Sequence, residues 1–588
     1  MSILNESLAQ TLSAPITAAQ AQVDGGSLSP KDGKSYVVGD SAEPLLFQTI
    51  PQMLRDTVAR HGPRDALVVP FQNRRLTYYD FDREVDALAT GLLALGLNKG
   101  DRIGIWSPNR YEWVLTQFAT ARIGLVLVNI NPAYRLSELE YALNKVSCKA
   151  IVTAQAFKSS DYMQMLRDLA PELDDCTPGR LQSARLPHLK IVIAMGADAG
   201  KGVFTFDEVA NLGGPSQQLR LASIDASLDP DDPINIQFTS GTTGAPKGAT
   251  LTHYNILNNA RFVTGRINLT EMDKLCIPVP LYHCFGMVMG ALGCVTKGAT
   301  MVFPTEGFEP VATLKAVEAE RCTGLYGVPT MFVSMLQELD NQPCDLSSLR
   351  TGVMAGAPCP MEVMQRVIAR MHMSEVTICY GMTETAPVSF QSFGDDPLEK
   401  RCGTVGRVHP HLEVKIIDDA GAIVPVGTQG QLCTRGYSVM KGYWDEAEKT
   451  AESIKDGWML TGDLAVLDED GFCSIVGRVK DMIIRGGENI YPREIEEYLF
   501  RHPDVAVVQV FGIPHEKLGE EVCAWVIPNP GADLTAEKIT AFCAGQIAHY
   551  KVPKHIRIVD EIPMTITGKP QKFVMRDWMI KNAGRVSG

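Results

Sequence analysis

The residues best suited to hold phosphate lie in one stretch, 239–248, which reads TSGTTGAPKG. Its glycines let a ligand approach the backbone, and its hydroxyl groups and Lys247 can donate hydrogen bonds to phosphate oxygens. It is not a Walker A motif, because Pro246 stands where the second glycine is required and Gly248 follows the lysine. We therefore predict a phosphate loop of another class, with a structural turn as the alternative. The predicted contacts are Thr239, Ser240, Gly241, Thr242, Thr243, Gly244 and Lys247.

Four further motifs follow this loop along the chain. They occupy residues 380–384 (YGMTE), 461–463 (TGD), 477–481 (GRVKD) and 563–569 (PMTITGK). Together with the loop they resemble the signatures of the adenylate-forming superfamily, which contains acyl-CoA synthetases, peptide-synthetase adenylation domains and beetle luciferases. The motifs stand in the expected order and extend the resemblance over nearly the whole chain, so chance does not explain them.

The resemblance implies an α/β fold with a large N-terminal adenylate-forming domain, built of α/β subdomains, and a small mobile α+β C-terminal domain. It also implies a reaction in two steps. A carboxylate is a poor acyl donor, but its attack on the α-phosphate of ATP forms an acyl-adenylate with a good leaving group. The acyl group then passes to coenzyme A as a thioester. ATP, Mg²⁺ and coenzyme A are implied, and no tightly bound cofactor is expected.

The resemblance also assigns roles to the polar residues of the motifs. Thr383 would contact the α-phosphate, and Glu384 would hold Mg²⁺, a hard cation that prefers carboxylate oxygens. Lys569 would bridge the substrate carboxylate and the α-phosphate, where an ammonium group screens the repulsion between two anions. The structural alternatives are a surface acid, a solvated lysine and, for Tyr380, a core aromatic. The implied nucleoside contacts are Asp463 and Arg478 at the ribose, and Tyr380, Gly381, Gly356, Ala357 and Pro358 around the adenine.

The domain boundary is predicted at Lys480, which occupies the hinge position of the family. The predicted divisions are a poorly ordered lead-in over residues 1–45, an N-terminal ATP- and acyl-binding domain over 46–479 and a C-terminal mobile domain over 480–588. Rotation about the hinge would withdraw Lys569 between the half-reactions and bring Gly486 and Gly487 to the pantetheine arm of coenzyme A. A tight turn is the structural alternative for the two glycines.

The acyl pocket is predicted around residues 280–286 (PLYHCFG), which resemble the family segment that lines it. His283 is interpreted as a pocket wall or gate, with a core histidine as the alternative, because a fatty acid is already ionised at neutral pH and needs no base. No cationic residue stands out in the pocket segments to pair with a second charge on the substrate. The predicted lining is His283, Phe285, Tyr326, Gly327 and Val328.

Longer blocks resemble the medium-chain acyl-CoA synthetases grouped as acyl-CoA synthetase family member 2 and their bacterial relatives. These blocks lie at residues 232–238 (DPINIQF), 280–284 (PLYHC) and 480–492 (KDMIIRGGENIYP). We therefore expect a fatty acid–CoA ligase that favours a medium-chain or branched apolar acid. One alternative is an adenylating enzyme that passes the acyl group to a carrier protein or oxidises it. Another is a catalytically silent acyl- or nucleotide-binding protein.

Composition limits the partners and the compartment. The 588-residue chain has 55 basic and 68 acidic residues and a net charge of −13, which disfavours nucleic acid as a partner. Its 14 cysteines form no Cys-x-x-Cys pair and are interpreted as reduced thiols. The apolar segment 284–295 is shorter than the roughly 20 residues of a spanning helix, so a buried helix is predicted. With no arginine before Arg55, a mitochondrial presequence is disfavoured, and a cytoplasmic enzyme, monomeric or homo-oligomeric, is expected.

Alternating strand and helix patterns must position these motifs. Residues 234–238 are predicted as a strand that enters the phosphate loop, and a helix from 252 to about 263 follows it. Strands are also predicted at 414–418 and 473–476. The predicted C-terminal order is a helix that begins at Pro492, strands at 505–510 and 521–527, a helix at 536–547 and a strand at 555–559.

Overall fold

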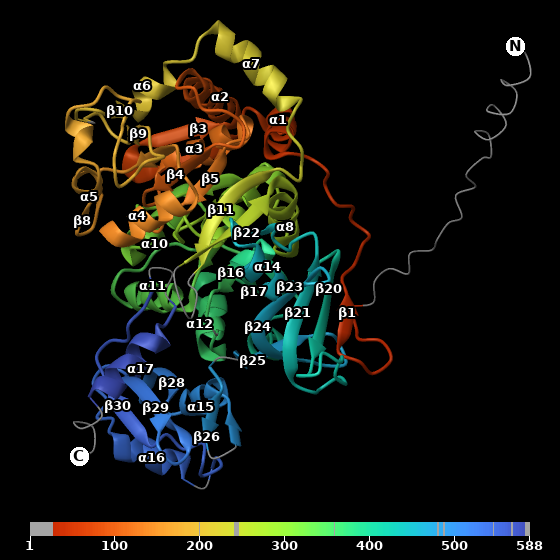
Figure 1. Ribbon diagram of the computed structural model, residues 1–588. Helices are drawn as coiled ribbons and strands as arrows, with labels where there is room; N and C mark the ends of the chain where they lie inside the picture. The colour runs from red at the N-terminus through yellow and green to blue at the C-terminus, as the bar shows by residue number, and fades with distance from the viewer. Residues whose placement is uncertain are drawn as a thin grey trace, which may run out of the picture.

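Strands carry or flank most of the motifs in the computed structural model of this chain. The structure describes residues 28–198, 200–239, 246–357, 359–478, 481–485, 488–544, 546–565 and 569–582. Figure 1 shows a large body and, beneath it, a smaller lobe formed by the C-terminal segment, drawn in blue. This mixed arrangement of helices and strands in a large and a small part confirms the predicted fold class.

One layer of the large body is a sheet of eight strands, as far as the chain is described. In spatial order they are β10 (Phe204–Thr205), β9 (Ile191–Ala194), β6 (Ala150–Thr153), β4 (Arg102–Trp106), β5 (Val126–Asn129), β11 (Pro233–Thr239), β12 (Lys247–Thr252) and β22 (Gly442–Tyr443). The strands from β10 to β11 are parallel, and β12 pairs antiparallel with its two neighbours, β11 and β22. β5, β6 and β9 are buried throughout, as their apolar sequences require. β11 confirms the predicted strand before the phosphate loop.

A second sheet of nine described strands forms the other main layer. Its strands are β19 (Arg407–Val408), β18 (Val388–Gln391), β17 (Glu375–Gly381), β16 (Thr351–Ala355), β15 (Gly324–Gly327), β13 (Lys274–Cys276), β14 (Thr300–Val302), β2 (Asp65–Val69) and β3 (Arg74–Thr77). The central strands from β17 to β2 are parallel. Parallel strands end at one edge, so β17 delivers the motif 380–384 to the same edge as the loops after β13 and β15.

Helix α8 (His253–Arg266) lies between the two sheets, since it contacts both β12 and β18. Its start is the predicted one: the Thr252 hydroxyl accepts from the Asn255 N–H at 3.1 Å, and the Asn255 side chain accepts from the Thr252 N–H at 3.0 Å. The remaining helices of the large body are α1 (Ile50–His61), η1 (Pro70–Gln72), α2 (Tyr78–Ala94), α3 (Tyr111–Arg122), α4 (Leu136–Lys145), α5 (Tyr162–Leu169), η2 (Pro171–Asp174), α6 (Phe206–Ala210), α7 (Pro215–Asp225), η3 (Phe285–Leu292), α9 (Gly293–Lys297), α10 (Pro310–Glu320), α11 (Pro329–Asn341), α12 (Met361–Met371), η4 (Thr383–Thr385), α13 (Leu398–Gly403) and α14 (Ala447–Ser453).

A third large sheet of this body is antiparallel, and β7 (Ala156–Phe157) and β8 (Ser160–Asp161) form a separate two-stranded sheet. The described strands of the third large sheet are β1 (Tyr36–Val38), β20 (Leu412–Ile417), β21 (Gly430–Gly436), β24 (Trp458–Leu467), β23 (Ile454–Lys455) and β25 (Cys473–Arg478). β20 and β25 confirm two predicted strands. β1 pairs with β20, so residues 36–38 are a strand, and the predicted poorly ordered lead-in is wrong for them. The pairing is stabilised by Val37, which is buried in the core of this sheet.

The C-terminal lobe has its own apolar cores, drawn from residues 483–579. Its elements are β26 (Ile483–Arg485), β27 (Glu488–Ile490), α15 (Pro492–Leu499), β28 (Val505–His515), β29 (Gly519–Pro528), α16 (Ala536–Cys543), β30 (His555–Ile558) and α17 (Lys572–Lys581). Each predicted C-terminal element is present. α16 ends at Cys543, earlier than predicted, because the backbone of Ala544 is extended.

The apolar segment 284–295 forms a buried helix, as predicted. It is π-helical in η3 and continues as α9. The Tyr326 hydroxyl donates to the Met289 carbonyl, and the Gln117 amide to the Met287 carbonyl, both at 3.3 Å. These bonds satisfy backbone oxygens that the buried helix would otherwise leave unpaired. None of the described helices is long and apolar enough to cross a membrane.

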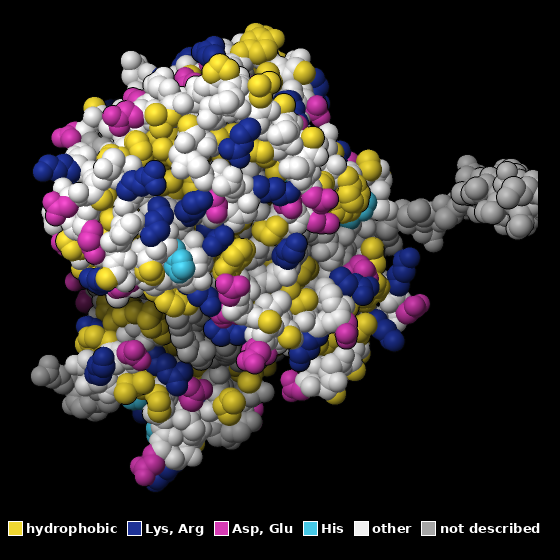
Figure 2. Space-filling view, turned by 45° about the horizontal axis from the view of Figure 1, so that its top comes forward, with side chains coloured by type: hydrophobic (Ala, Val, Ile, Leu, Met, Phe, Trp, Pro, Cys, Tyr) yellow, Lys and Arg dark blue, Asp and Glu magenta, His cyan; other side chains and the backbone are white. Residues whose placement is uncertain are grey.

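Charged side chains are distributed, not segregated, on the face seen in Figure 2. Lys and Arg, in blue, alternate with Asp and Glu, in magenta, over the described residues of this face, and apolar groups lie between them. Such alternation keeps the local electrostatic potential low. This face is therefore unlike the large single-sign surfaces that attract polyanions.

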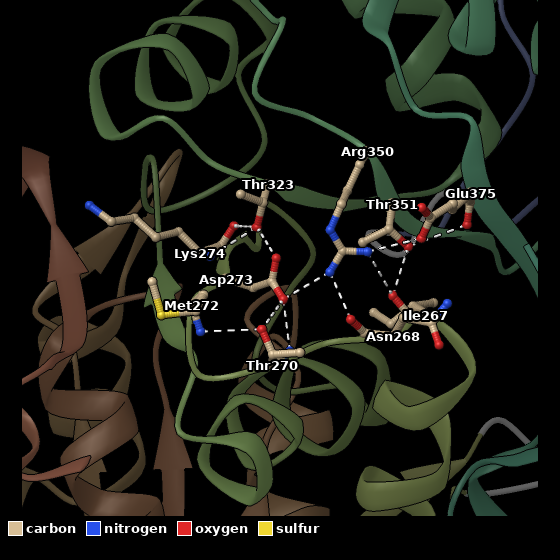
Figure 3. A network of polar contacts seen from close by, with 10 residues as sticks. All are labelled: Ile267, Asn268, Thr270, Met272, Asp273, Lys274, Thr323, Arg350, Thr351 and Glu375. Carbon is tan, nitrogen blue, oxygen red and sulfur yellow. Dashed lines mark hydrogen bonds and ion pairs between the residues drawn. The ribbon is translucent and has the colours of Figure 1, made fainter.

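A buried carboxylate connects the amino ends of parallel strands in the nine-stranded sheet, at the edge opposite the motif 380–384 (Figure 3). Asp273 accepts from the Thr323 hydroxyl at 2.7 Å and the Thr270 N–H at 2.7 Å, and Arg350 pairs with it at 2.8 Å. Arg350 also donates to the Asn268 carbonyl beyond α8 at 2.7 Å. Burial opposes ionisation, but these hydrogen bonds and the charge of Arg350 outweigh it, so the pKa of Asp273 lies below its ordinary value.

We expect Asp273→Asn to lower the free energy of unfolding by about 2 kcal/mol at pH 7, because it removes a buried, hydrogen-bonded charge. Wild-type Asp273 makes its full contribution to the free energy of unfolding above about pH 4. This contribution is lost as the pH falls through the lower pKa that Asp273 has in the folded state. Denaturant unfolding at pH 7 and pH 3 measures the effect of the substitution and its dependence on pH. Asp340→Asn, which breaks an exposed ion pair with Arg370, is the control and should cost less than about 0.5 kcal/mol. An equal loss from Asp273→Asn at both pH values would contradict this account.

Candidate active site

Part of the predicted site lies outside the described residues. These positions are Ser240, Gly241, Thr242, Thr243, Gly244, Pro358, Lys480, Gly486 and Gly487. The other predicted residues come from all three sheets of the large body and from the C-terminal lobe. Their relative positions are therefore set by tertiary contacts between distant parts of the chain.

Glu384 is a point at which the two large sheets meet. It lies in η4, directly after β17, and its Oε1 accepts from the Thr239 hydroxyl at 3.1 Å and the Tyr443 hydroxyl at 3.0 Å. Thr239 ends β11 and Tyr443 ends β22, so both donors come from the eight-stranded sheet. The Lys247 ammonium lies 4.5 Å from the centre of the Tyr443 ring. The residues that flank the phosphate loop are thus connected to the predicted metal-binding carboxylate.

Asp463, on β24, forms the second buried carboxylate of the site. The Tyr380 hydroxyl donates to its Oδ2, and Arg478 Nε pairs with its Oδ1 at 3.2 Å. Burial raises the pKa of Asp463, and the charge of Arg478 partly offsets this rise. Three predicted nucleoside contacts, from β17, β24 and β25, therefore form one hydrogen-bonded group.

Two predicted nucleoside glycines occupy backbone positions that restrict other residues. Gly356 has φ of +91°, a left-handed conformation that side chains disfavour. At Gly381 a Cβ would lie 1.8 Å from the Pro387 carbonyl oxygen, which no side chain allows. The glycines therefore have structural reasons for their identity, and Ala357 lies beside Gly356 at the end of β16.

Lys569 is the contribution of the C-terminal lobe. Its N–H donates to the Thr565 hydroxyl at 3.0 Å, and its carbonyl accepts from the Thr565 N–H at 2.8 Å. Burial lowers the pKa of Lys569 and the charge of Arg478 lowers it further, whereas the charges of Asp463 and Glu384 raise it. The lobe thus brings an ammonium group into the electrostatic neighbourhood of both buried carboxylates.

A polar cavity of about 40 Å³ lies beside this group. It is lined by Asn129, Asn131, Tyr134, Gln237, Phe238, Tyr282, His283 and Thr383. The His283 Nδ1 accepts from the Phe285 N–H at 3.2 Å. Burial, with the positive charge of Lys569, lowers the pKa of His283 to about 3, so the ring is neutral at physiological pH.

A larger cavity of about 300 Å³ lies on the other side of Tyr282, which borders both. Apolar groups form much of its wall: Pro108, Phe157, Pro278, Pro280, Phe308, Val328 and Met331. Lys158, Glu306, Ser334 and Thr565 add polar groups. An apolar slot with a few polar groups is the usual form of a small-molecule site.

The five predicted acyl-pocket residues do not share one cavity. Among the described residues, His283 borders the small cavity and Val328 the large one, but the other three border neither. The Phe285 and Tyr326 rings are buried with centres 5.3 Å apart, and a Cβ on Gly327 would approach Phe332 within 3.0 Å. These three are closely packed and lie outside the linings of both described cavities.

Two further residues of this region have no motif that predicts them. Tyr443 is 59 residues from Glu384 along the chain, and only the pairing of β22 with β12 brings it to the site. Lys158 lies in the turn between β7 (Ala156–Phe157) and β8 (Ser160–Asp161), with φ of +52°. It supplies a cation to the large cavity from outside the predicted acyl segments.

The order of these motifs and their convergence are those of a known enzyme family. Residues 54–444 match the family described as AMP-binding enzyme, and residues 494–569 match the AMP-binding enzyme C-terminal domain. The chain therefore belongs to the AMP-binding enzyme family. The sequence-based resemblance to this superfamily is confirmed.

Named relatives cover almost the whole chain. "Medium-chain acyl-CoA ligase ACSF2, mitochondrial" of Danio rerio is 49% identical over 554 residues, which cover 94% of this chain and 91% of the relative. The protein of the same name from Homo sapiens is 46% identical and covers 95% and 92%. The crystal structure of ATP-bound MatB from Rhodopseudomonas palustris is similar with a TM-score of 0.78 at 28% identity, over 91% of this chain and 99% of that one.

We expect Tyr443→Phe to lower the rate of acid-dependent ATP–pyrophosphate exchange about tenfold, the effect of one lost hydrogen bond to a charged group. The phenyl ring of Tyr443→Phe keeps the contact with Lys247, so Tyr443→Leu should lower the exchange rate further. Tyr437→Phe is the matched control, because its hydroxyl, also buried, contacts Asn259 and not Glu384. Equal rates for Tyr443→Phe and the wild type would show that the hydroxyl on Glu384 has no role.

Proposed function

We propose that this chain is an AMP-forming fatty acid–CoA ligase that acts on a medium-chain or branched apolar acid. The observation that carries the proposal is the meeting of the motifs at two buried carboxylates: the Thr239 hydroxyl, at the end of the phosphate-loop strand, binds Glu384, and Arg478 pairs with Asp463. ATP and the acid would give acyl-adenylate and pyrophosphate. The acyl-adenylate and coenzyme A would then give acyl-CoA and AMP. The names of relatives that match over nearly their whole length support this reaction.

In the first step, an oxygen of the acid's carboxylate attacks the α-phosphorus while the bond to pyrophosphate breaks. Two anions must approach each other, and the Lys569 ammonium would offset their repulsion. Thr383 would donate to the α-phosphate, and Lys247 with the loop 239–248 would hold the β- and γ-phosphates. Because Lys569 comes from the C-terminal lobe, the step requires the lobe to be closed on the large body.

The nucleoside would be held by the group around Asp463. A carboxylate has two oxygens and can accept hydrogen bonds from both ribose hydroxyls. Arg478 and the Tyr380 hydroxyl keep it oriented before ATP binds, which lowers the cost of ordering it on binding. Tyr380 would stack on the adenine, with Gly381, Gly356, Ala357 and Pro358 around it.

The residues present fit magnesium at Glu384. Two hydroxyl donors bind its Oε1, and neither binds its Oε2. Among the described residues no group of three or more His, Cys, Asp or Glu could hold an ion alone, which suits a cation that takes most of its ligands from phosphates and water. When bound, Mg²⁺ supplies neutralisation of the charge that develops on the leaving pyrophosphate.

Coenzyme A would enter after the lobe turns about Lys480, and Gly486 and Gly487 would flank its pantetheine arm. The separate cores of the large body and of residues 483–579 support a boundary between 46–479 and 480–588. A lobe with its own core can rotate as a unit, because few buried contacts need to break. Rotation would remove Lys569 once the acyl-adenylate has formed.

The cavity of about 300 Å³ is the candidate seat for the acyl chain. Its apolar wall supports an acid of medium length or with branches, and Val328 is the predicted acyl residue that borders it. Lys158 could pair with a second carboxylate, so dicarboxylic acids belong in any test series. His283, which is neutral, would act as a wall or gate between this slot and Thr383.

We extend the proposal to the compartment and the assembly. A cytoplasmic enzyme is supported by 14 free cysteines, most of them buried. The two ACSF2 relatives are named as mitochondrial, so cell fractionation must decide between the two compartments. Sedimentation analysis would distinguish a monomer from a homo-oligomer.

We expect turnover to depend on coenzyme A and to peak at intermediate chain length when acids from C2 to C18 are supplied with ATP and Mg²⁺. Formation of AMP and acyl-CoA, measured with coenzyme A present and withheld, tests both points. A matched series of dicarboxylic acids, repeated with Lys158→Ala, tests the cation in the large cavity. Acyl-adenylate that accumulates without a thioester would favour a carrier-protein acceptor, and no pyrophosphate release would favour a silent binding protein.

We expect Lys569→Ala to lose most adenylation, by a factor of about 100 or more, because charge stabilisation in the transition state is removed. Thioester formation from supplied acyl-adenylate should be retained, since the lobe has turned away by then. Lys572→Ala is the control on the same lobe, where Lys572 pairs with Glu496 at 2.7 Å. Equal loss of both steps would count against the assignment.

A further inference from the structure

A chain of buried side-chain amides runs across the eight-stranded sheet below the phosphate loop. Asn235 and Gln237 lie two residues apart on β11, so their side chains share a face, and both are almost fully buried. The Gln237 Nε2 donates to Asn235 Oδ1 at 2.9 Å, and the Asn235 Nδ2 donates to Asn129 Oδ1 on β5 at 2.9 Å. Parallel strands buried on both faces are normally apolar, so this polar row is unusual.

The same row of buried amides holds the acyl segment on both sides of His283. The Cys284 thiol donates to Gln237 Oε1 at 3.0 Å, and the Asn129 Nδ2 donates to the Tyr282 carbonyl at 2.9 Å. Tyr282 and Cys284 are the immediate neighbours of His283 along the chain. Two hydrogen bonds therefore anchor the segment that presents the imidazole to the small cavity.

Thr383 closes the connection. It lines the same cavity of about 40 Å³ as Gln237 and His283, and it is the immediate chain neighbour of Glu384. β11 leads from Gln237 to Thr239, whose hydroxyl donates to Glu384. One continuous set of contacts thus joins the phosphate-loop strand, the acyl segment and the candidate α-phosphate contact.

Burial of this polar row costs free energy, which suggests that the row has a function. Every buried amide must find partners, and removal of one leaves others unpaired. The Gln237 amide uses both its ends here, toward Asn235 and toward Cys284. A leucine or valine at this strand position would fill similar space without this requirement, but it would leave the acyl segment without a fixed distance from β11.

We propose that Gln237 is a positioning residue of the ligase, which acts through Cys284 to set the place of His283 and of the acid's carboxylate relative to Thr383. The inference rests on the proposed adenylation reaction and adds to it a link between the ATP and acyl halves of the site. Gln237 does not touch the reacting atoms in this account. Its loss should therefore alter the use of the acid more than the use of ATP.

The test compares Gln237→Met, Cys284→Ala and the double variant in acid-dependent ATP–pyrophosphate exchange. Each single variant should raise the KM for the acid about tenfold, as expected for one lost hydrogen bond, with the KM for ATP within about twofold of the wild type. The double variant should also raise the KM for the acid about tenfold, because the two residues act through one contact. Cys284→Ser, which keeps a donor, should recover most of the wild-type KM.

Gln391→Met is the matched control, because Gln391 is a buried amide on β18 of the other sheet and bonds to Thr377, Val263 and His409. It should lower the thermal midpoint without a change in the ratio of the two KM values. Additive effects in the double variant, or a lower thermal midpoint with an unchanged KM for the acid, would overturn the inference. Absence of acid-dependent exchange in the wild type would instead overturn the proposed function, and the inference with it.

Discussion

The arrangement of this protein depends on one buried carboxylate that joins two sheets. Glu384 follows a strand of the nine-stranded sheet, and both hydroxyls that bind it come from the eight-stranded sheet. A buried charge without partners is costly, so the two sheets are stable only in positions that keep Thr239 and Tyr443 within reach. The same constraint places the flanks of the phosphate loop beside the motif 380–384, and a cation that binds phosphates there would meet a prepared acid.

The second carboxylate, Asp463, repeats this arrangement in the third sheet. A tyrosine hydroxyl again binds one oxygen, and Arg478 binds the other. Together the two acids create a region of negative charge that favours the ammonium of Lys569. The two acids therefore attract the lysine of the C-terminal lobe, whereas its burial and the charge of Arg478 oppose its ionisation. Once the charges of a bound nucleotide change during the reaction, this attraction changes too, which is a physical basis for a lobe that moves between steps.

The acyl side is organised by hydrogen bonds instead of charges. Buried amides on β5 and β11 hold the segment around His283, and the π-helix that follows is satisfied by Gln117 and Tyr326. Burial removes the positive charge from His283, so Lys569 is the charged group there and His283 a neutral one. Phe285 and Tyr326 pack against each other outside the two described cavities, and Tyr282 borders the apolar slot. The separation of a charged nucleotide half from a neutral acyl half matches the chemistry of an anion that carries an apolar tail.

The sequence by itself determined the fold class, the family, the order of the motifs and most strands and helices near them, because glycine-rich loops, apolar runs and capping residues are local signals. It could not predict Tyr443, Lys158 or the amide chain through Gln237, since their meaning lies in partners that are distant along the chain. Tyr443 reaches Glu384 only through strand pairing, and the contact between the Phe285 and Tyr326 rings likewise joins residues that are distant along the chain. Residues 36–38 became a strand because β20 offered an edge. Local patterns fix which element forms, but contacts, burial and charge pairing arise only when the elements are brought together.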